Sequence, residues 1–413
     1  TRPVTLTSVD GAAVTTLRSP GPNRLMVVRH PQAIVERLGF TGVSLGYPES
    51  GALSMSNGTV RDCIFTNCHL GTDGGAIHLD AGLVHDCWIV KNGANHQNTG
   101  RGGGVCLKGG VVSNCVIAGN QSWDSGGGIY MTAGLVTRCM ITNNFMYGFY
   151  GTDGGGGVYM TGGRLENCLV TSNRFTDTTP VYGAGIYMTG GAIVHSTVAD
   201  NRRAGGDNFS GLYMTGGVVT NSIFYYNGAG FPAVANENVY MSAGAMTYSC
   251  AQPLVAGDGN TADDPAFVSR AANDYHLATG SFAADTATNL PDVLVDIEGA
   301  VRPTDGNGDL VDRSDMGCYE KAAAGAAFEC SFSGAPTAGT NSLTVVFTAA
   351  VSGPGTNVVT YYWDWENDGL VDYAGPDASV VTNLYAEPGL YSVRLVCTNA
   401  LGDTASQTKV SYV

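Results

Sequence analysis

The chain has 413 residues, of which only 13% are charged, and its formal net charge is −15. This negative charge argues against nucleic acid and anionic lipid as partners, because both bind to basic surfaces. The 44% share of hydrophobic residues excludes a disordered chain, and no apolar run reaches the roughly 18–20 residues of a membrane span. We therefore expect neutral glycans, other proteins or divalent cations as partners, and no direct membrane insertion.

Residues 1–55 carry loosely repeated apolar stretches such as "RLMVVRH" and "RLGFTGVSL". Short apolar stretches between turn residues favour strands. We expect this segment to form an N-terminal cap and the first turns of the repeat that follows it. Because Thr1 stands where a methionine would start a new chain, we expect a processed or trimmed segment.

A regular repeat covers residues 56–250. Its length varies from 24 residues, between Cys63 and Cys87, to 29 residues, between Cys139 and Cys168. One Cys or Ser in each unit sets the alignment, at Cys63, Cys87, Cys115, Cys139, Cys168, Ser196, Ser222 and Ser249. Five residues later most units have an asparagine, at Asn92, Asn120, Asn144, Asn173, Asn201 and Asn227.

Three adjacent columns recur earlier in each unit. The first is aliphatic, at Ile77, Val105, Ile129, Val158, Ile186, Leu212 and Val239. The second becomes tyrosine, at His78, Cys106, Tyr130, Tyr159, Tyr187, Tyr213 and Tyr240, and the third becomes methionine, at Leu79, Leu107, Met131, Met160, Met188, Met214 and Met241. A unit of short strands and Gly-Gly turns cannot bury its own apolar face, so stacking is required. The repeat therefore predicts an all-β fold, a parallel β-helix.

The columns have structural explanations. Aliphatic and methionine positions are two residues apart and share the inner face of a strand, which leaves the tyrosines outside. Asparagine suits a left-handed turn, and its amides can bond along the axis. Cysteine acts as a small buried hydrophobe that serine replaces, so we expect neither a metal site nor disulfides from that column. His78, His85, His96 and His195 lack zinc-ligand spacing.

The recurring "GGGIYMT-GG-VxNCxxxxN" units resemble those of bacterial surface repeat proteins with GGG-Ala-aromatic motifs. The resemblance covers about Ala52 to Cys250 and places the repeat in the pectate-lyase-like superfamily. It implies a right-handed parallel β-helix on a secreted bacterial protein. That superfamily also includes polysaccharide lyases and hydrolases, so an enzyme is the alternative.

Four aspartates in the loops before the aliphatic column are the weak catalytic candidates. These are Asp73, Asp124, Asp153 and Asp207. Stacked coils would align them on one edge, and a hydrolase needs two carboxylates facing one groove. Spacing alone picks out no pair, and aspartate before glycine is also a common turn residue. We favour the turn interpretation and expect no catalytic residues.

The same variable loops are rich in aromatic residues. As ligand-binding candidates we select Trp123, Tyr147, Tyr150, Phe175 and Tyr182. Exposed aromatic rings stack on sugar rings or pack against another protein. The alternative is that they fold back over the coil.

Residues 251–320 lose the repeat and resemble the choice-of-anchor module that closes such helices in large secreted proteins. A terminal module protects the open sheet edge. The run Asp305, Asn307, Asp309, Asp312 and Asp315 places oxygen ligands at short intervals, as calcium requires, with a solvated acidic turn as the alternative. Cys250 and Cys318 flank the module and are a possible disulfide pair.

Residues 328–413 follow the linker "KAAAGAA". The stretches "YYWDWENDGLVDYAG" and "YAEPGLYSVRLVCTNALGDTAS" resemble a polycystic-kidney-disease-type (PKD) domain, which implies an immunoglobulin-like β-sandwich. On that resemblance Cys330 and Cys397 are a possible bridge. Asp364 and Asp368 are a second candidate calcium site.

The sequence thus favours a non-catalytic extracellular or cell-surface protein that is structural or adhesive. A rod with two different ends suits head-to-tail assembly into fibres with other copies or surface proteins. The alternatives are a polysaccharide lyase, a glycoside hydrolase or a glycan-binding module that uses the loop edge. Calcium is the only cofactor expected.

Overall fold

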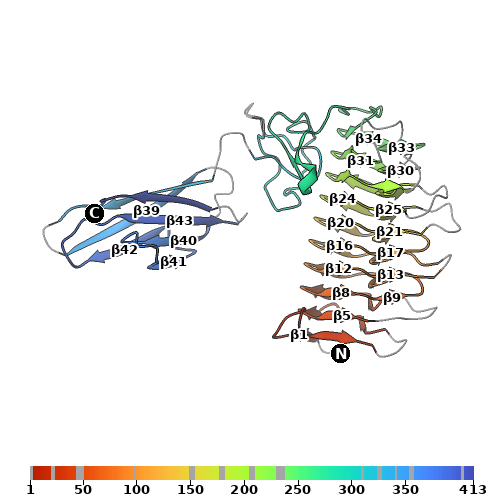
Figure 1. Cartoon of the computed structure of the whole chain (residues 1–413), viewed down its shortest axis with the longest axis horizontal. Helices are drawn as coiled ribbons and strands as arrows, with labels where there is room; N and C mark the ends of the chain where they lie inside the picture. The colour runs from red at the N-terminus through yellow and green to blue at the C-terminus, as the bar shows by residue number, and fades with distance from the viewer. Residues whose placement is uncertain are drawn as a thin grey trace.

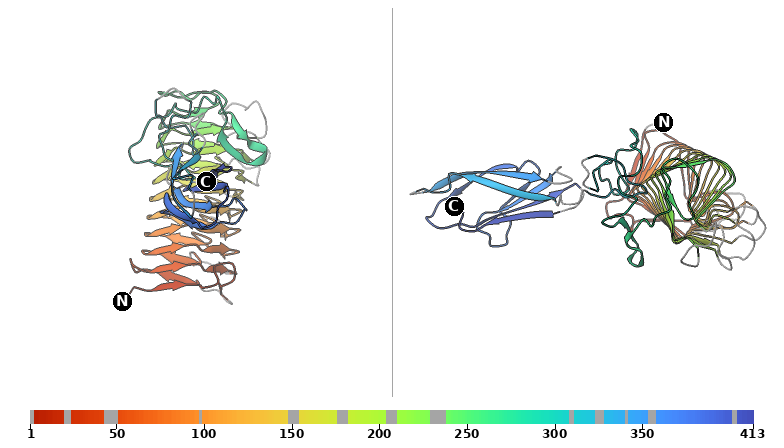
Figure 2. Two further views of the ribbon diagram at one scale, coloured as in Figure 1. Left: turned by 90° about the vertical axis from the view of Figure 1, so that its left-hand side faces the viewer. Right: turned by 90° about the horizontal axis from the view of Figure 1, so that it is seen from above.

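A computed structural model describes residues 3–19, 24–42, 51–96, 99–147, 154–175, 182–203, 210–228, 238–307, 311–322, 328–339, 342–352, 358–400 and 404–413. Over residues 5–251 the chain forms a parallel β-helix, and a separate β-sandwich follows it (Figure 1). Seen along the axis, the coils superimpose around one core (Figure 2). The predicted all-β fold is therefore confirmed.

Four parallel sheets build the β-helix. Sheet A consists of β1 (Thr5–Thr7), β4 (Ile34–Glu36), β7 (Thr59–Arg61), β11 (Leu83–His85), β15 (Val111–Ser113), β19 (Leu135–Thr137), β23 (Arg164–Glu166), β27 (Ala192–Val194), β31 (Val218–Thr220) and β34 (Ala245–Thr247). Sheet B consists of β2 (Thr16–Arg18), β5 (Gly39–Thr41), β8 (Ile64–Thr66), β12 (Trp88–Val90), β16 (Val116–Ala118), β20 (Met140–Thr142), β24 (Leu169–Thr171), β28 (Thr197–Ala199), β32 (Ile223–Tyr225) and β35 (Cys250–Ala251).

The other two sheets complete each coil. Sheet C consists of β3 (Met26–Val28), β6 (Leu53–Met55), β10 (Ile77–Leu79), β14 (Val105–Leu107), β18 (Ile129–Met131), β22 (Val158–Met160), β26 (Ile186–Met188), β30 (Leu212–Met214) and β33 (Val239–Met241). Sheet D has two-residue strands, β9 (His69–Leu70), β13 (Gly93–Ala94), β17 (Gln121–Ser122), β21 (Phe145–Met146), β25 (Arg174–Phe175) and β29 (Arg202–Arg203).

The aliphatic and methionine columns fill the interior, as predicted. Ile129 and Met131 on β18 are fully buried, and the corresponding positions in the neighbouring coils form one continuous core with them. The tyrosines between them face outward and stack on one another, with centroids 5.2 Å apart for Tyr130 and Tyr159 and planes 10° from parallel. Side-chain alternation along each strand thus separates an apolar inner face from an aromatic outer column.

The asparagine column is a buried hydrogen-bond ladder. Asn144 Oδ1 accepts from the backbone N and the side-chain Nδ2 of Asn120, at 2.9 and 3.0 Å. The amide of Asn144 in turn donates to Asn173 Oδ1 and to the carbonyl of Ile117. The expected left-handed conformation belongs to the preceding residue instead, for example Asn143 with φ 54°. That part of the prediction is wrong, because the ladder asparagine supplies the buried amide and the residue before it adopts the left-handed turn conformation.

The Cys/Ser column has the same kind of role. Cys115 Sγ donates to the carbonyl of Ser113 at 3.1 Å, and Ser222 Oγ donates to the carbonyl of Thr220 at 2.8 Å. Serine and cysteine therefore make equivalent contacts at this position. This explains why the repeat changes from one to the other without losing register.

Residues 252–322 close the last coil and pack along the side of the β-helix (Figure 1). Thr261 accepts from the backbone N of Ala251 and donates to the carbonyl of Ser249, so it pairs with the final strand of sheet B. Beyond it lie β36 (Phe267–Ser269), the 3-10 helix η1 (Arg270–Ala272) and β37 (Asp274–Leu277). Covering the open edge removes unpaired backbone groups.

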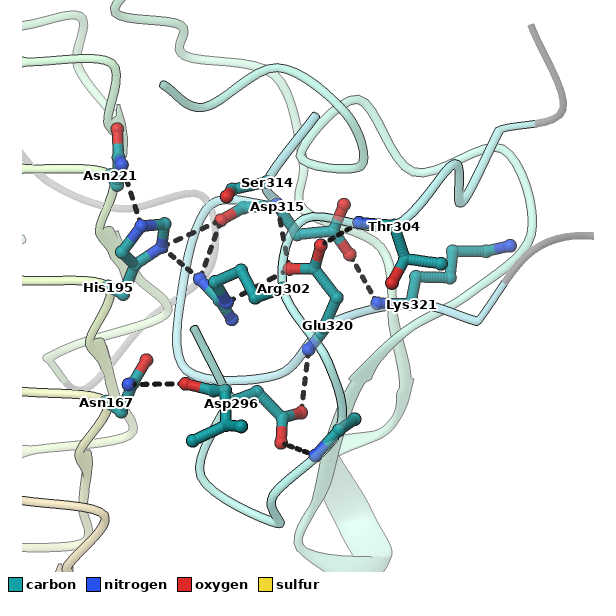
Figure 3. Close-up of polar contacts among 12 residues, drawn as sticks. Asn167, His195, Asn221, Asp296, Arg302, Thr304, Ser314, Asp315, Glu320 and Lys321 are labelled. Atoms are coloured by element: carbon teal, nitrogen blue, oxygen red, sulfur yellow. Dashed lines mark hydrogen bonds and ion pairs between the residues drawn. The ribbon is translucent and has the colours of Figure 1, made fainter. Parts of the chain in front are cut away.

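A buried polar network joins this module to the β-helix (Figure 3). His195, directly after β27, contacts the Arg302 guanidinium and the carbonyl of Asp315. Arg302 Nε lies 3.1 Å from Glu320 Oε2, and both side chains are buried. Burial and Arg302 lower the pKa of His195, so its ring is neutral. The module is therefore fixed by specific side chains as well as by apolar packing.

The sandwich pairs two antiparallel sheets around its own core. One sheet contains β38 (Glu329–Ala335), β39 (Leu343–Ser352) and β42 (Val380–Tyr385), and the other contains β40 (Val358–Asp364), β41 (Tyr373–Gly375), β43 (Val393–Asn399) and β44 (Thr404–Lys409). Trp363 is fully buried and its Nε1 donates to the carbonyl of Ala378 at 2.9 Å. The tryptophan-rich motif of the sequence thus forms the centre of this core.

Neither disulfide considered from the sequence is formed. Cys250 and Cys318 are both free, and Cys250 Sγ donates to the carbonyl of Asp263. Cys330 and Cys397 are also free thiols, but they contact each other across the sandwich, where a hydrogen bond from Cys397 lowers the pKa of Cys330. Cys250 and Cys318 therefore lie in separate apolar clusters, whereas Cys330 and Cys397 lie in the core of the sandwich and contact each other.

Candidate functional site

The outward face of sheet D carries polar, aromatic and basic side chains on successive coils. Its strands have parallel register, so Gln121, Phe145, Arg174 and Arg202 occupy one column on successive coils. Each of these residues directly follows a buried ladder residue, Asn120, Asn144, Asn173 or Asn201. With a strand spacing of about 4.8 Å, six strands give a strip about 24 Å long. The rigid ladder thus presents a polar, aromatic and basic strip to solvent.

The middle of the strip is aromatic. Trp123 and Tyr147 lie side by side with ring centroids 5.2 Å apart, and Phe145 meets Tyr147 edge to face at 5.4 Å. All three rings are only partly buried. The Arg174 guanidinium lies over the Phe145 ring, 5.0 Å from its centroid. Rings held in this way offer apolar faces that suit the C–H face of a sugar.

Amide side chains line the strip before the aromatic rings. Gln121 Nε2 donates to Asn95 Oδ1 at 3.1 Å, and Gln121 Oε1 accepts from the Tyr147 hydroxyl at 3.3 Å. Asn95 also contacts His69 Nδ1 at 3.3 Å. Amide and hydroxyl groups both donate and accept, so this part of the surface matches the hydroxyl groups of a carbohydrate.

The strip ends at a basic pocket between sheet D and the C-terminal module. The pocket has a volume of about 550 Å³ and includes Arg174, Arg202, Arg270, Asp200 and Tyr275 in its lining. Asp200 binds Arg270 at 2.6 Å and accepts from the Tyr275 hydroxyl at 2.9 Å. One carboxylate therefore faces three guanidinium groups, and the pocket carries an excess of positive charge in a chain of net charge −15.

Arg202 and Arg174 are the exposed cations of this pocket. Arg202 extends from β29 and is accessible to solvent, whereas Arg270 is held by Asp200 and by the ring of Tyr226, 3.6 Å from its centroid. Burial, together with Asp200, raises the pKa of Tyr275 above its usual range, so Tyr275 stays a neutral hydrogen-bond donor. The pocket can therefore hold an anionic group without a metal ion.

The predicted carboxylates are not gathered into a catalytic pair in the part of the chain that the structure describes. Asp73 is buried and bound to Arg101 at 3.0 Å and Lys108 at 3.4 Å. Asp124 lies two coils further along, with Arg101 on the coil between them. Asp153 and Asp207 lie outside the described residues. Asp73 and Asp124 thus offer no groove with two facing carboxylates.

Two of the predicted aromatic contacts differ from expectation. Phe175 is 1% exposed, because it is the inward residue of β25 while Arg174 is the outward one. The prediction of Phe175 as a ligand-binding residue is therefore wrong. Tyr182 stacks on Tyr213 at 4.5 Å and belongs to the outer face of sheet C. Tyr150 lies outside the described residues.

Four of the five residues in the acidic run of the C-terminal module belong to the described part of the chain. Both carboxylate oxygens of Asp315 accept backbone N–H groups, from Asp285 and Lys321. Asp312 is exposed, and so is Asn307. Asp305 is half-buried, and Asp309 lies outside the described residues. Calcium binding by this run stays a prediction.

The acidic turn of the sandwich is more compact. Asp364, Glu366 and Asp372 each offer one ligand atom within 4.8 Å of the others. Asp364 also accepts from the backbone N of Asp368 and of Gly369, so Asp368 is adjacent to the group. Calcium at this turn also stays a prediction, with the residues now placed together.

Sequence reasoning did not select the arginines of the pocket. Arg174 and Arg202 occupy the position after the ladder asparagine, which is Gln121 and Phe145 in earlier coils. The position after the ladder asparagine can be read from the sequence, and it predicts that these unlike residues form one outward column. Arg270 carries no such signal, since it comes from outside the repeat.

Comparison with known proteins supports one part of this architecture. A search of curated proteins finds no match to the chain. In the described part of the chain, no helix is long and apolar enough to cross a membrane. The family model of the PKD domain matches residues 329–412, which are the strands of the sandwich from β38 to β44.

Proposed function

We propose that this chain is a non-catalytic extracellular adhesive protein whose β-helix binds glycans along the outward face of sheet D. The observation that supports this most is the continuous strip from Asn95 and Gln121 through Trp123 and Tyr147 to the basic pocket. Its amides match sugar hydroxyls, its rings match sugar faces, and its arginines match carboxylate or sulfate groups. The PKD domain, a type typical of extracellular proteins, serves as a spacer or docking module.

The ligand class follows from the charge of the pocket. Arg174, Arg202 and Arg270 outnumber the single carboxylate of Asp200, so a glycan that carries carboxylate or sulfate groups fits better than a neutral one. Because Arg174 and Arg202 are exposed, their attraction is screened by salt. Binding is therefore expected to weaken as ionic strength rises.

The test is affinity electrophoresis of the full chain in gels that contain carboxylated, sulfated or neutral polysaccharides. Trp123→Ala and Arg202→Ala are each expected to weaken binding about five- to tenfold, a loss of about 1–1.4 kcal/mol. Trp88→Ala and Arg29→Ala are matched controls, because Trp88 lies on sheet B and Arg29 follows β3 near the first coils. Equal loss in the controls, or equal binding to every polysaccharide, contradicts the proposal.

The enzyme alternative is tested on the same polysaccharides. Release of shortened or unsaturated products by the wild-type chain, abolished by Asp124→Asn, contradicts the non-catalytic part of the proposal. Asp73→Asn serves as the comparison, since its ion pairs with Arg101 and Lys108 give it a structural role.

Assembly into fibres stays a second proposal. The last coil is paired with Thr261 of the C-terminal module, so its sheet edges are partly occupied. Fibres would therefore need contacts of the sandwich, and we expect negative-stain images of a chain that lacks residues 328–413 to contain none.

A further inference from the structure

A second cluster of polar side chains lies on the outer face of sheet C, apart from the proposed glycan surface. His78 on β10 and Cys106 on β14 are register neighbours at the start of the column that becomes tyrosine from Tyr130 onward. Asp73 precedes β10 and reaches the same place. One ligand atom from each of Asp73, His78 and Cys106 lies within 4.8 Å of the others. A carboxylate, an imidazole and a thiol are thus gathered at one point.

The thiol of Cys106 differs from the other β-helix thiols. Cys106 is fully buried, and no hydrogen bond of its sulfur to another described residue is found. By contrast, Cys115 and Cys139 donate to backbone carbonyls two residues earlier, at 3.1 and 3.3 Å. The Cys106 side chain therefore points at Asp73 and His78 with its bonding capacity unused.

His78 has one occupied and one open nitrogen. Its Nε2 lies 3.2 Å from Asp80 Oδ1, while its Nδ1 is buried and has no partner among the described residues. When Nε2 carries the proton and donates it to Asp80, Nδ1 presents a lone pair. A carboxylate that orients a histidine in this way is typical of metal centres.

The surroundings enclose the cluster and hold its carboxylate. Arg101 Nε lies 3.0 Å from Asp73 Oδ1, and Lys108 Nζ lies 3.4 Å from Asp73 Oδ2. Arg101 also lies over the Tyr130 ring, 4.9 Å from its centroid. A Cβ placed on Gly74 would come 3.2 Å from Cys106 Cβ, so the loop after Asp73 packs directly against Cys106. The two cations orient Asp73 from outside and leave the thiol and imidazole facing each other.

We propose that Asp73, His78 and Cys106 form a zinc-binding site on the outer face of sheet C. Oxygen, nitrogen and sulfur donors together suit zinc, whereas calcium and magnesium take oxygen ligands. Three protein ligands leave a fourth position of the tetrahedron for water or another ligand. The Cys106 thiol loses its proton to solvent when the thiolate binds zinc.

Zinc-ligand spacing is absent from the sequence because the ligands come from two coils. Asp73 and His78 belong to one coil and Cys106 to the next, and parallel pairing alone brings them together. The inference does not depend on glycan binding, since sheet D contributes no ligand.

The test is titration of the metal-stripped full chain with Co²⁺ as a spectroscopic substitute for zinc. We expect one equivalent to produce a thiolate-to-cobalt charge-transfer band together with visible bands of tetrahedral cobalt, and Zn²⁺ to displace it. Cys106→Ser is expected to abolish the charge-transfer band, and His78→Gln to weaken binding at least about tenfold. Cys250→Ser, at a buried free thiol of the C-terminal module, is the matched control and keeps the band.

The proposal is overturned if the wild-type chain binds no cobalt, or if the charge-transfer band persists in Cys106→Ser at wild-type stoichiometry. Circular dichroism establishes that each variant is folded. Should Cys106→Ser fail to fold, the titration of His78→Gln decides. This variant is expected to fold, because the His78 side chain is partly exposed and the glutamine amide can replace its hydrogen bond to Asp80. Unchanged affinity in folded His78→Gln then overturns the assignment.

Discussion

Each asparagine of the buried ladder bonds to the coil before it and to the coil after it. Asn144 accepts from Asn120 and donates to Asn173, and its Nδ2 also reaches the carbonyl of Ile117. These groups are fully buried, so water cannot replace a missing partner. An orphaned buried polar group costs about 1–3 kcal/mol. The ladder therefore makes a large contribution to the stability of the β-helix through few residues.

We expect Asn144→Ala to lower the free energy of unfolding by about 3 kcal/mol or more. The substitution removes the acceptor of the backbone N and of one side-chain amide N–H of Asn120, and it removes the amide that donates to the carbonyl of Ile117. Chemical denaturation followed by circular dichroism measures the change. Asn95→Ala is the control, because Asn95 is exposed and its loss is expected to cost less than about 1 kcal/mol. Equal effects of the two substitutions would contradict the role of the ladder.

At the scale of single elements, the turn between β40 and β41 concentrates negative charge. Burial and the neighbouring Asp372 raise the pKa of Glu366, which shows that the carboxylates of the turn repel one another. Trp365 donates its backbone N to Asp372 at 2.7 Å, so the turn is ordered by hydrogen bonds as well. A divalent cation would relieve the repulsion without changing the strands.

We expect calcium to stabilise the sandwich by up to about 2–3 kcal/mol at a hundredfold excess over its Kd. The measurement is the thermal unfolding of the full chain with and without calcium. Asp372→Asn is expected to remove the calcium-induced rise in unfolding temperature while keeping the hydrogen bond to Trp365. Asp377 is exposed and lies outside the cluster, so Asp377→Asn is expected to keep that rise. A calcium shift of the same size in Asp372→Asn would rule out binding at this turn.

For the whole molecule, the polar network at the C-terminal module connects distant parts of the chain. Arg302 faces Asp315 and Glu320 in a buried site, and burial raises the pKa of both carboxyl groups. In the unfolded chain these groups titrate near pH 4. A carboxyl whose pKa is higher in the folded state gives stability that falls as pH rises from about 4 towards neutral and above.

His195 of the same network acts in the opposite direction below about pH 6.5, because burial and Arg302 lower its pKa in the folded state. We therefore expect the β-helix with its docked module to unfold at a lower temperature at pH 8 than at about pH 6.5. Glu320→Gln removes one titrating group and is expected to flatten this dependence, whatever its effect on absolute stability. Asp258→Asn, an exposed acid of the same module, is expected to leave the slope unchanged. The unfolding temperature measured at several pH values tests this prediction, and a stability that rises with pH over this range would contradict it.

The sequence predicted the parts of this molecule that repeat. The columns around Ile129 and Met131 and the outward Tyr130 were correct, because strand alternation and stacking follow from local pattern. Trp123 is half-buried beside Tyr147, and its ligand-binding role stays a prediction. Phe175 is buried instead, since a shift of one residue in a two-residue strand reverses the face. Contacts outside the repeat carry no pattern. His195 and Arg302, for example, are 107 residues apart.

The unequal lengths of the repeats have a further consequence. Parallel register holds from coil to coil, yet β17 and β18 are separated by Trp123–Gly128, whereas the next coil has the much longer segment 147–157 in the same place. Extra residues thus enter at one edge of the coil, beside the proposed glycan surface, and the buried ladders are unaffected. Such a scaffold can acquire new recognition loops by insertion, and foreign loops can be grafted there with little cost to folding.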